Sequence, residues 1–171
     1  MINEGKNKKI LYEILQDVED FANMKNIDYP PIYLLGGSGC IIAGYLDRAT
    51  TDIDLLDLDY DASVGRLLRI MEKYDFLDLY LTTIPMDFKD RARKIEKFRN
   101  IYVLSREDII LSKIGRYSEI DIEDISVMIK NADKKLIADL IGKVMARENL
   151  SERVKQAFSK NVKLFRERFD V

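Results

Sequence analysis

The chain has 171 residues, of which 47% are hydrophobic and 34% are charged, and its formal net charge at pH 7 is −2. Such a chain is long enough to bury a core of its own, and none of its apolar runs approaches the roughly 20 residues of a membrane span. It has no histidine and a single cysteine, Cys40, which excludes Ser-His-Asp triads, zinc sites that need imidazole, and intramolecular disulfides.

The first nine residues are mostly polar, and no apolar segment with a cleavage site follows them as it would in a secretory signal. We therefore expect a cytoplasmic protein without a membrane partner. Cys40 has apolar neighbours, which indicates a small buried side chain in a reducing environment.

Helices and strands alternate along the first hundred residues. An amphipathic helix is predicted over 6–25, because apolar residues recur there at helical spacing. Strands are expected at 32–35, 52–56, 76–82 and 101–104, with a short helix from Ser38 and a longer one over 64–74. From Ser105 onward the pattern is helical, and the last two helices are expected at 134–147 and 151–169.

This order predicts an α/β (α+β) fold, in which a sheet is flanked by helices and followed by a C-terminal helical part. We place the α/β core in residues 1–104 and the helical region, packed on that core, in residues 105–171. The last two helices each carry an apolar stripe, which is typical of a buried face. The stripe of the final helix alternatively binds a partner chain.

Glycines and aspartates form the most distinctive pattern of the chain. Gly36, Gly37 and Ser38 follow the first predicted strand, where glycines allow close backbone approach and the first amides of a helix point at an anion. Asp52 and Asp54 are two residues apart, so both carboxylates leave the same face of a strand and can share a divalent cation. Oxygen ligands of this kind suit Mg²⁺ or Mn²⁺.

The acidic run continues beyond this pair. Asp57 and Asp59 have the opposite parity to Asp52 and Asp54, so we expect them to mark the end of the strand. Asp61 is a candidate N-cap for the next helix.

The spacing from Gly36, Gly37 and Ser38 to Asp52 and Asp54 resembles the signature of the nucleotidyltransferase superfamily, whose members share a polymerase-beta-like fold. The resemblance implies that the sheet flanked by helices is a mixed sheet. The form Arg-x-Thr-x-Asp-Ile-Asp is similar to that of small stand-alone prokaryotic members, including the nucleotidyltransferase toxins of abortive-infection and toxin-antitoxin systems. The resemblance implies that a nucleoside triphosphate binds with Mg²⁺ or Mn²⁺, with the glycine turn and Ser38 at the phosphates.

In this family a third metal-binding carboxylate comes from a later strand. Asp78 lies on the polar face of the strand predicted at 76–82 and is the natural candidate for it. The alternative is that Asp78 merely faces solvent, in which case Asp87 is the fallback.

A second segment, 104–124, resembles the downstream helical region of these proteins, with its Lys, Arg and paired Asp. Lys113 and Arg116 lie three residues apart on one helix face, and the resemblance implies that they contact the nucleotide phosphates. Asp121 and Asp124 also share a face and would support the site. The alternative for these residues is a set of surface salt bridges between two helices.

Charge is unevenly distributed along the chain. Between Asp47 and Asp61 there are six Asp and one Arg, whereas residues 134–171 contain ten Lys or Arg and five Asp or Glu. An acidic cluster attracts a cation. The basic end either guides a phosphate-rich partner such as RNA or solvates exposed helix faces.

We therefore expect a metal-dependent nucleotidyltransferase that moves a nucleoside monophosphate from a nucleoside triphosphate to a hydroxyl of RNA, protein or a small molecule. Asp52 and Asp54 would bind the metal ions, and Asp78 would complete the site and help to deprotonate the attacking hydroxyl. The alternative is a catalytically inactive module that binds nucleotide or a partner protein, such as a cognate antitoxin. A helical adaptor would leave the glycine and aspartate pattern unexplained.

Overall fold

The computed structural model describes residues 5–171, and the chain divides into two units. Unit 1 comprises Met1–Leu77 and Ala92–Val103, and unit 2 comprises Asp78–Arg91 and Leu104–Val171. Unit 2 therefore contains the C-terminal helices together with a segment, Asp78–Arg91, that the sequence pattern assigns to the α/β core.

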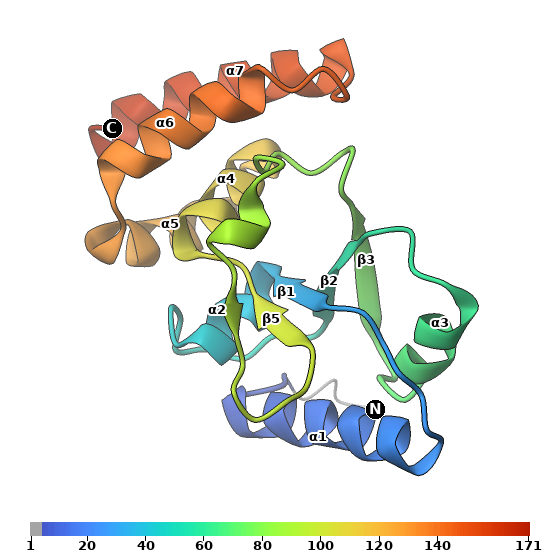
Figure 1. Ribbon diagram of the computed structural model, residues 1–171. Coiled ribbons are helices and arrows are strands. Elements are labelled where there is room, and N and C mark those ends of the chain that lie inside the picture. Colours follow the sequence, from blue (N-terminus) through green and yellow to red (C-terminus); the bar gives the residue numbers. More distant parts are fainter. Residues whose placement is uncertain (1–4) are drawn as a thin grey trace. The chain divides into compact units, whose positions relative to one another are not determined.

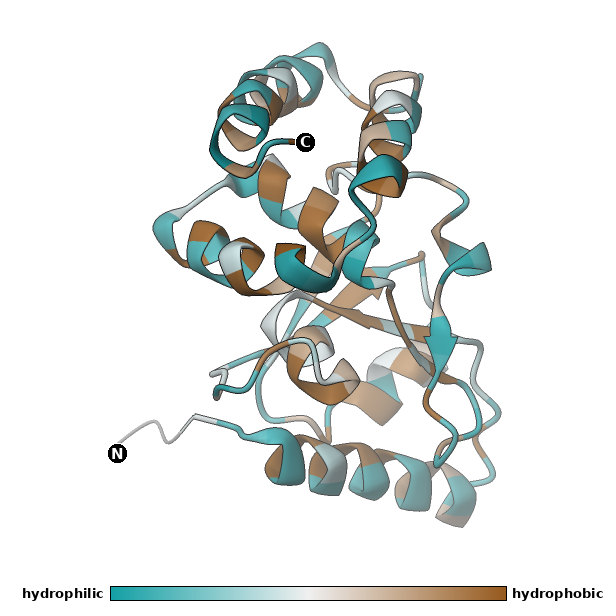
Figure 2. Ribbon diagram, turned by 90° about the vertical axis from the view of Figure 1, so that its left-hand side faces the viewer, coloured by the Kyte–Doolittle hydropathy of each residue, from teal (hydrophilic) through white to brown (hydrophobic). Residues whose placement is uncertain are grey.

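The first helix of unit 1, α1 (Lys8–Met24), begins after Asn7, whose side chain accepts a hydrogen bond from the N–H of Ile10 at 3.0 Å. Apolar and polar residues alternate along α1, as Figure 2 shows in brown and teal. Its buried residues are Leu11, Leu15, Val18, Glu19 and Ala22. The predicted amphipathic helix is therefore confirmed, with bounds within two residues of those expected.

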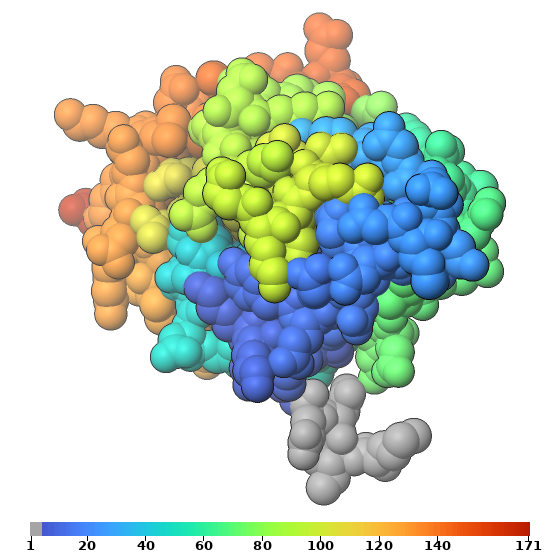
Figure 3. All heavy atoms as spheres, turned by 60° about the horizontal axis from the view of Figure 1, so that its bottom comes forward, coloured from blue at the N-terminus to red at the C-terminus, as the bar shows by residue number. Residues whose placement is uncertain are grey.

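A buried carboxylate ties α1 to a segment about 80 residues later in the chain. Glu19 accepts hydrogen bonds from the hydroxyl of Tyr29 and from the guanidinium and N–H of Arg99. Burial raises the pKa of Glu19, but these hydrogen bonds outweigh it and hold that pKa below its ordinary value. Figure 3 shows the two segments side by side, α1 in blue and the later segment in yellow-green.

The sheet is mixed, as predicted, and has the strand order β3-β2-β1-β5-β4 (Figure 1). Its central strand β1 is antiparallel to β2 and parallel to β5, while β4 is antiparallel to β5. The strands are β1 (Ile32–Leu35), β2 (Ile53–Asp57), β3 (Tyr74–Asp78), β4 (Arg93–Lys94) and β5 (Ile101–Val103).

The register of β1 and β2 brings the glycine turn to the aspartate pair. Leu35 pairs with Asp54 across the two strands, and α2 (Gly36–Ala43) follows Leu35 directly. The helix therefore begins two residues before Ser38, the predicted start, and its first residue adjoins the partner of Asp54.

Two predicted boundaries after β2 are wrong. The helix expected over 64–74 is α3 (Ala62–Leu68), which begins after the predicted cap Asp61. The strand expected over 76–82 is Tyr74–Asp78. It ends there because the Asp78 carboxylate accepts the N–H of Tyr80 at 2.7 Å, and the Asp78 carbonyl accepts the N–H groups of Leu81 and Thr82.

Unit 2 is helical. Its longer helices each begin after a capping side chain that accepts a hydrogen bond from a first-turn N–H, provided by Ser105, Ser118, Asp133 and Ser151. The helices are α4 (Arg106–Arg116), α5 (Glu119–Met128), α6 (Lys134–Met145) and α7 (Glu152–Phe169), with short 3₁₀ turns η1 (Phe88–Asp90) and η2 (Ile129–Asn131). Both helices predicted at the end of the chain are confirmed.

Helix α4 is the centre of this unit, because it packs against α5, α6 and α7. The apolar stripes predicted for the last two helices are buried, through Ile137, Leu140 and Val144 on α6 and Phe158, Val162 and Phe165 on α7. Within residues 5–171, no helix combines the length and the apolar character needed to cross a bilayer.

Candidate nucleotide site

The candidate site in unit 1 begins with a close approach between the glycine turn and Asp54. Gly36 has a φ of +58°, and a Cβ added to it would lie 2.0 Å from Oδ2 of Asp54. The N–H of Gly37 donates to the same oxygen at 3.0 Å. The turn therefore holds the Asp54 carboxylate, and only glycine fits at position 36.

Ser38 fixes the backbone of the same aspartate. Its side chain is fully buried, its hydroxyl donates to the carbonyl of Leu35 at 3.3 Å, and its oxygen accepts the N–H of Asp54 at 2.9 Å. Ser38 thus joins β1 and α2 to β2. Phosphate binding by Gly36, Gly37 and Ser38 stays a prediction.

Asp54 lies in β2, whereas Asp52 lies just before this strand, which begins at Ile53. Ile53 and Leu55 are buried, whereas Asp52 and Asp54 are half-buried. Oδ2 of Asp52 accepts the hydroxyl of Thr51 at 2.7 Å. Each carboxylate is therefore oriented by a neighbouring donor, and a shared face for the pair stays a prediction.

Two cationic side chains lie near this acidic loop. A Cβ added to Gly37 would lie 3.2 Å from Nη2 of Arg48, so the guanidinium borders the glycine turn. Lys6 pairs with Thr50 through main-chain hydrogen bonds in both directions, and its ammonium donates to the carbonyl of Thr51. The sequence marks Arg48 only as part of a motif and gives no signal for Lys6, because their contacts depend on the fold.

The donor set at Asp52 and Asp54 fits Mg²⁺ or Mn²⁺ as part of a coordination sphere. Magnesium in nucleotide sites is held by one or two carboxylates, with the remaining ligands supplied by substrate phosphates and water. Across residues 5–171, no three Asp, Glu, His or Cys side chains are grouped closely enough to hold a metal by themselves. The pair therefore suits a metal that arrives with a triphosphate.

Asp78 and Asp87, the candidates for the third ligand, both lie in unit 2. Asp78 is exposed at the end of β3, and its Oδ1 accepts a hydrogen bond from the N–H of Tyr80. Asp87 forms ion pairs with Arg91 at 3.0 Å and with Lys143 at 2.8 Å. The hydrogen bond from Arg91, followed by that from Lys143, lowers the pKa of Asp87 to about 2. A third metal ligand stays a prediction, and Asp78 is the better candidate because Asp87 already has two cationic partners.

The segment that follows Asp78 is held by a buried arginine that the sequence pattern does not reveal. Arg147 is 5% exposed, and its guanidinium donates to the carbonyls of Thr82 and Ile84, both at 2.8 Å, and of Leu79 at 3.0 Å. A planar guanidinium can serve several carbonyls at once. Arg147 therefore fixes the turn in which Asp78 is the first residue.

Lys113, Arg116, Asp121 and Asp124 are brought together between α4 and α5. Lys113 is 2% exposed, and its ammonium lies 3.2 Å from Asp121 and 2.7 Å from Asp124. Arg116 adds a contact of 2.9 Å to Asp121. Burial raises the pKa of Asp121, but the hydrogen bonds from Arg116 and Ser118 outweigh it and keep that pKa below its ordinary value.

These contacts are the interhelical salt bridges of the alternative interpretation, and the one centred on Lys113 is buried rather than on the surface. Phosphate binding by Lys113 would require its ammonium to leave two carboxylates. Contact of Lys113 and Arg116 with nucleotide stays a prediction, whereas their part in joining α4 to α5 is shown by the contacts.

Comparison with known proteins identifies the family. A family model described as nucleotidyltransferase of unknown function (DUF6036) matches residues 9–169. No curated protein and no solved structure matches the chain. The match covers both units, including the glycine turn, Asp52, Asp54 and the ion cluster around Lys113. The chain therefore belongs to this family of nucleotidyltransferases.

Proposed function

We propose that this protein transfers a nucleoside monophosphate from a nucleoside triphosphate to a hydroxyl group, in a reaction that depends on Mg²⁺ or Mn²⁺. The observation that carries the proposal is the contact of Gly36 and Gly37 with Asp54, since it presents a half-buried carboxylate at the first turn of a helix. Helix starts attract anions, and carboxylates attract the cations that accompany them. The metal would offset negative charge on the phosphates.

The residues of unit 1 have distinct roles in this proposal. Asp52 and Asp54 hold the metal, with Thr51 and Gly37 orienting their carboxylates. Arg48 and Lys6 bind the triphosphate from the cationic side of the same loop. The family resemblance implies the same role for Lys113 and Arg116, whose contact with nucleotide stays a prediction.

The reaction is a substitution at the α-phosphorus. The acceptor oxygen forms a bond to that phosphorus, and the bond to the oxygen that bridges to the β-phosphorus breaks, so that pyrophosphate leaves. The acceptor hydroxyl loses its proton, for which Asp78 is the proposed base. Arg48 and Lys6 would stabilise the charge on the departing pyrophosphate.

Incubation with labelled nucleoside triphosphates, Mg²⁺, total cellular RNA and protein tests the proposal. The unmodified chain is expected to label an acceptor, whereas the Asp52→Asn/Asp54→Asn variant is expected to label none. The control is Asp57→Asn/Asp59→Asn, which removes the same charge from the same acidic run and should keep its activity. Transfer by the Asp52→Asn/Asp54→Asn variant, folded by circular dichroism, would overturn the assignment.

A second candidate is a module that binds nucleotide or a partner protein without turnover. It is favoured by the finding that no group of three metal-binding side chains occurs among the described residues. Metal-dependent triphosphate binding with no labelled acceptor would support this candidate over transfer.

The resemblance to nucleotidyltransferase toxins adds a cognate antitoxin as a proposed protein partner. Growth arrest on expression of the unmodified chain, but not of the Asp52→Asn/Asp54→Asn variant, would support a toxin role. Equal growth of the two strains would argue against it.

A further inference from the structure

A groove on the surface of unit 2 runs along one face of α7, where it meets the end of α6. Its volume is about 360 Å³. Met145 of α6 lines it together with Lys155, Gln156, Ser159, Lys160 and Lys163 of α7, and Glu152 is the single acid among the lining residues. Each of these positions on α7 has others three or four residues away, so they share one face of the helix.

The groove carries a positive charge that the chain does not neutralise. Lys155 approaches Glu152 only to 4.0 Å. Lys160 and Lys163 are exposed, and among the described residues no side chain forms an ion pair or hydrogen bond with either ammonium group. The groove therefore presents an excess of positive charge that attracts anions.

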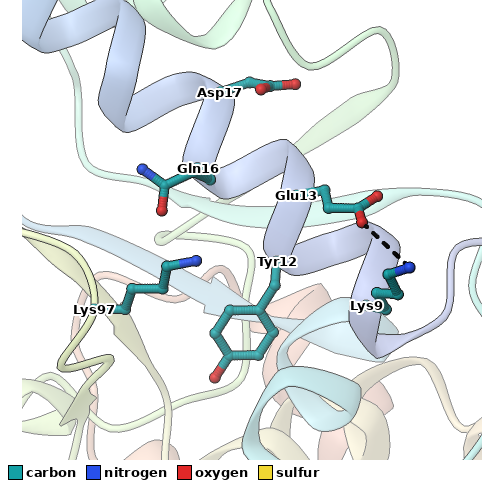
Figure 4. Close-up of a pocket in the computed structure, with 6 residues that line it drawn as sticks. All are labelled: Lys9, Tyr12, Glu13, Gln16, Asp17 and Lys97. Atoms are coloured by element: carbon teal, nitrogen blue, oxygen red, sulfur yellow. Dashed lines mark ion pairs between the residues drawn. The ribbon is translucent and has the colours of Figure 1, made fainter.

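A pocket of unit 1 has equal numbers of basic and acidic side chains in its lining. It is lined by Lys9, Tyr12, Glu13, Gln16, Asp17 and Lys97, so that two lysines face two acids (Figure 4). Lys9 and Glu13 lie 3.8 Å apart, as the dashed line shows. The excess of lysine is thus a property of the α7 groove and not of surface hollows in general.

The shape of the charged stripe favours a polymer over a small anion. Lys155 and Lys163 are eight residues apart, which on an α-helix is a rise of about 12 Å. Gln156 and Ser159 lie between the lysines and can donate hydrogen bonds to sugar hydroxyls and phosphate oxygens. Met145 is 36% exposed at one end and offers a polarisable apolar surface to a base.

We propose that this groove binds the ribose-phosphate backbone of an RNA, and that RNA is the acceptor of the transferred nucleotide. The second half of this inference rests on the proposed function, whereas RNA binding does not. Three lysines on one broad face of α7 can contact several phosphates of one strand, and the polar side chains between them can contact the 2′-hydroxyl groups that distinguish RNA from DNA.

The test measures RNA binding across a series of salt concentrations, without nucleotide. The Lys155→Gln/Lys160→Gln/Lys163→Gln variant is compared with the unmodified chain and with a matched control, Lys25→Gln/Lys130→Gln/Lys135→Gln, whose lysines are exposed elsewhere. Loss of three phosphate contacts should reduce the slope of log K against log salt by about 2, because each contact to a single strand contributes about 0.7. The control should keep the slope of the unmodified chain.

Transfer assays separate this inference from the proposed function. The groove variant should keep metal-dependent triphosphate binding while its KM for RNA rises, and a DNA of the same sequence should be a poorer acceptor. An unchanged salt slope in the groove variant, or label found only in protein, would overturn the inference and leave transfer intact. The proposed function would be overturned instead if the groove variant loses RNA binding as expected but neither the unmodified chain nor any variant transfers nucleotide. RNA binding by the groove would then still be supported.

Discussion

Gly36 and Asp54 lie so close that a Cβ on Gly36 would stand 2.0 Å from Oδ2 of Asp54. The glycine is 18 residues before the aspartate, and the antiparallel register of β1 and β2 brings them together. The contact gives a physical reason for the glycine turn and the Asp-x-Asp sequence to occur together in one chain. The turn needs a residue without a side chain, and the carboxylate needs the space that it leaves.

Gly36→Ala is therefore expected to abolish nucleotide transfer while leaving most of the fold. The positive φ alone costs about 1–2 kcal/mol for a residue with a Cβ, and the clash would displace the Asp54 carboxylate. Transfer and thermal unfolding are the measurements. Gly65→Ala is the control, since a Cβ there meets nothing within 4 Å and the change should raise helix stability by about 1 kcal/mol or less. Full activity of Gly36→Ala would show that the close contact has no part in the site.

Local patterns predicted much of this architecture correctly. The apolar run at 32–35 is β1, and the capping residues Asp61 and Ser105 accept the hydrogen bonds expected of them. The C-terminal helices follow from the same kind of periodicity, whereas the mixed sheet is implied by the family resemblance. The strand, the caps and the helices depend on residues within a few positions of one another, which a sequence displays directly.

Periodicity does not reveal the contacts that particular side chains make. The strand expected over 76–82 stops at Asp78 because the Asp78 carboxylate accepts the N–H of Tyr80. The guanidinium of Arg147 then donates hydrogen bonds to carbonyls of the following residues. The sequence also does not show that Lys113 is buried against two acids of the next helix, and its contact with nucleotide stays a prediction. Neither the competition for a backbone N–H nor the choice of ionic partner is encoded in periodicity.

Lys113→Met is expected to destabilise unit 2 by about 3–5 kcal/mol, because it leaves the buried charges of Asp121 and Asp124 without their shared cation. Urea unfolding followed by circular dichroism measures the effect. Arg116→Met is the matched control: its side chain is 58% exposed, so its loss should cost less than about 1 kcal/mol. Addition of Asp121→Asn and Asp124→Asn to Lys113→Met should recover part of the stability, and equal effects of the two single variants would contradict this account.

Arg48→Met is expected to raise the KM for the nucleoside triphosphate at least tenfold, with a smaller effect on kcat, because the guanidinium borders the glycine turn where the phosphates are proposed to bind. Steady-state kinetics over a range of triphosphate concentrations checks this. Arg66→Met, at an exposed position of α3, serves as the control for loss of a positive charge from unit 1. An unchanged KM would remove Arg48 from the proposed phosphate contacts.

Asp87 makes the stability of unit 2 sensitive to acid. Its pKa is about 2 in the folded chain against an ordinary value of 3.8, so between these values the unfolded chain binds more protons. The stabilisation is present above about pH 4 and is lost as the pH falls towards 2. Burial raises the pKa of Asp108, which also accepts hydrogen bonds from Arg91, so its protonation acts in the opposite sense.

The contribution of Asp87 is isolated by comparing unfolding free energies of the unmodified chain and Asp87→Asn at several pH values. The difference between them should be largest near neutral pH and should shrink between pH 4 and 2. A difference that does not change with pH would show that the ion pairs with Arg91 and Lys143 contribute nothing through the charge of Asp87.

Arg147 gives the sharpest test of how the segment after Asp78 is held. Arg147→Met leaves the carbonyls of Leu79, Thr82 and Ile84 without their donor, and we expect a loss of about 3 kcal/mol in urea unfolding. Arg153→Met, at an exposed site near the start of α7, should change stability by less than about 0.5 kcal/mol.

Activity of the Arg147 variants bears on Asp78 itself. If Asp78 supplies the base or a metal ligand, Arg147→Lys, which keeps the charge but not the planar set of donors, should lower kcat and raise the Mg²⁺ concentration needed for half-maximal transfer. Asp78→Asn should produce a larger loss of the same kind. Variants of Arg147 that lose stability but keep kcat and the Mg²⁺ requirement would show that the arginine serves the fold alone, and full activity of Asp78→Asn would remove Asp78 from the site.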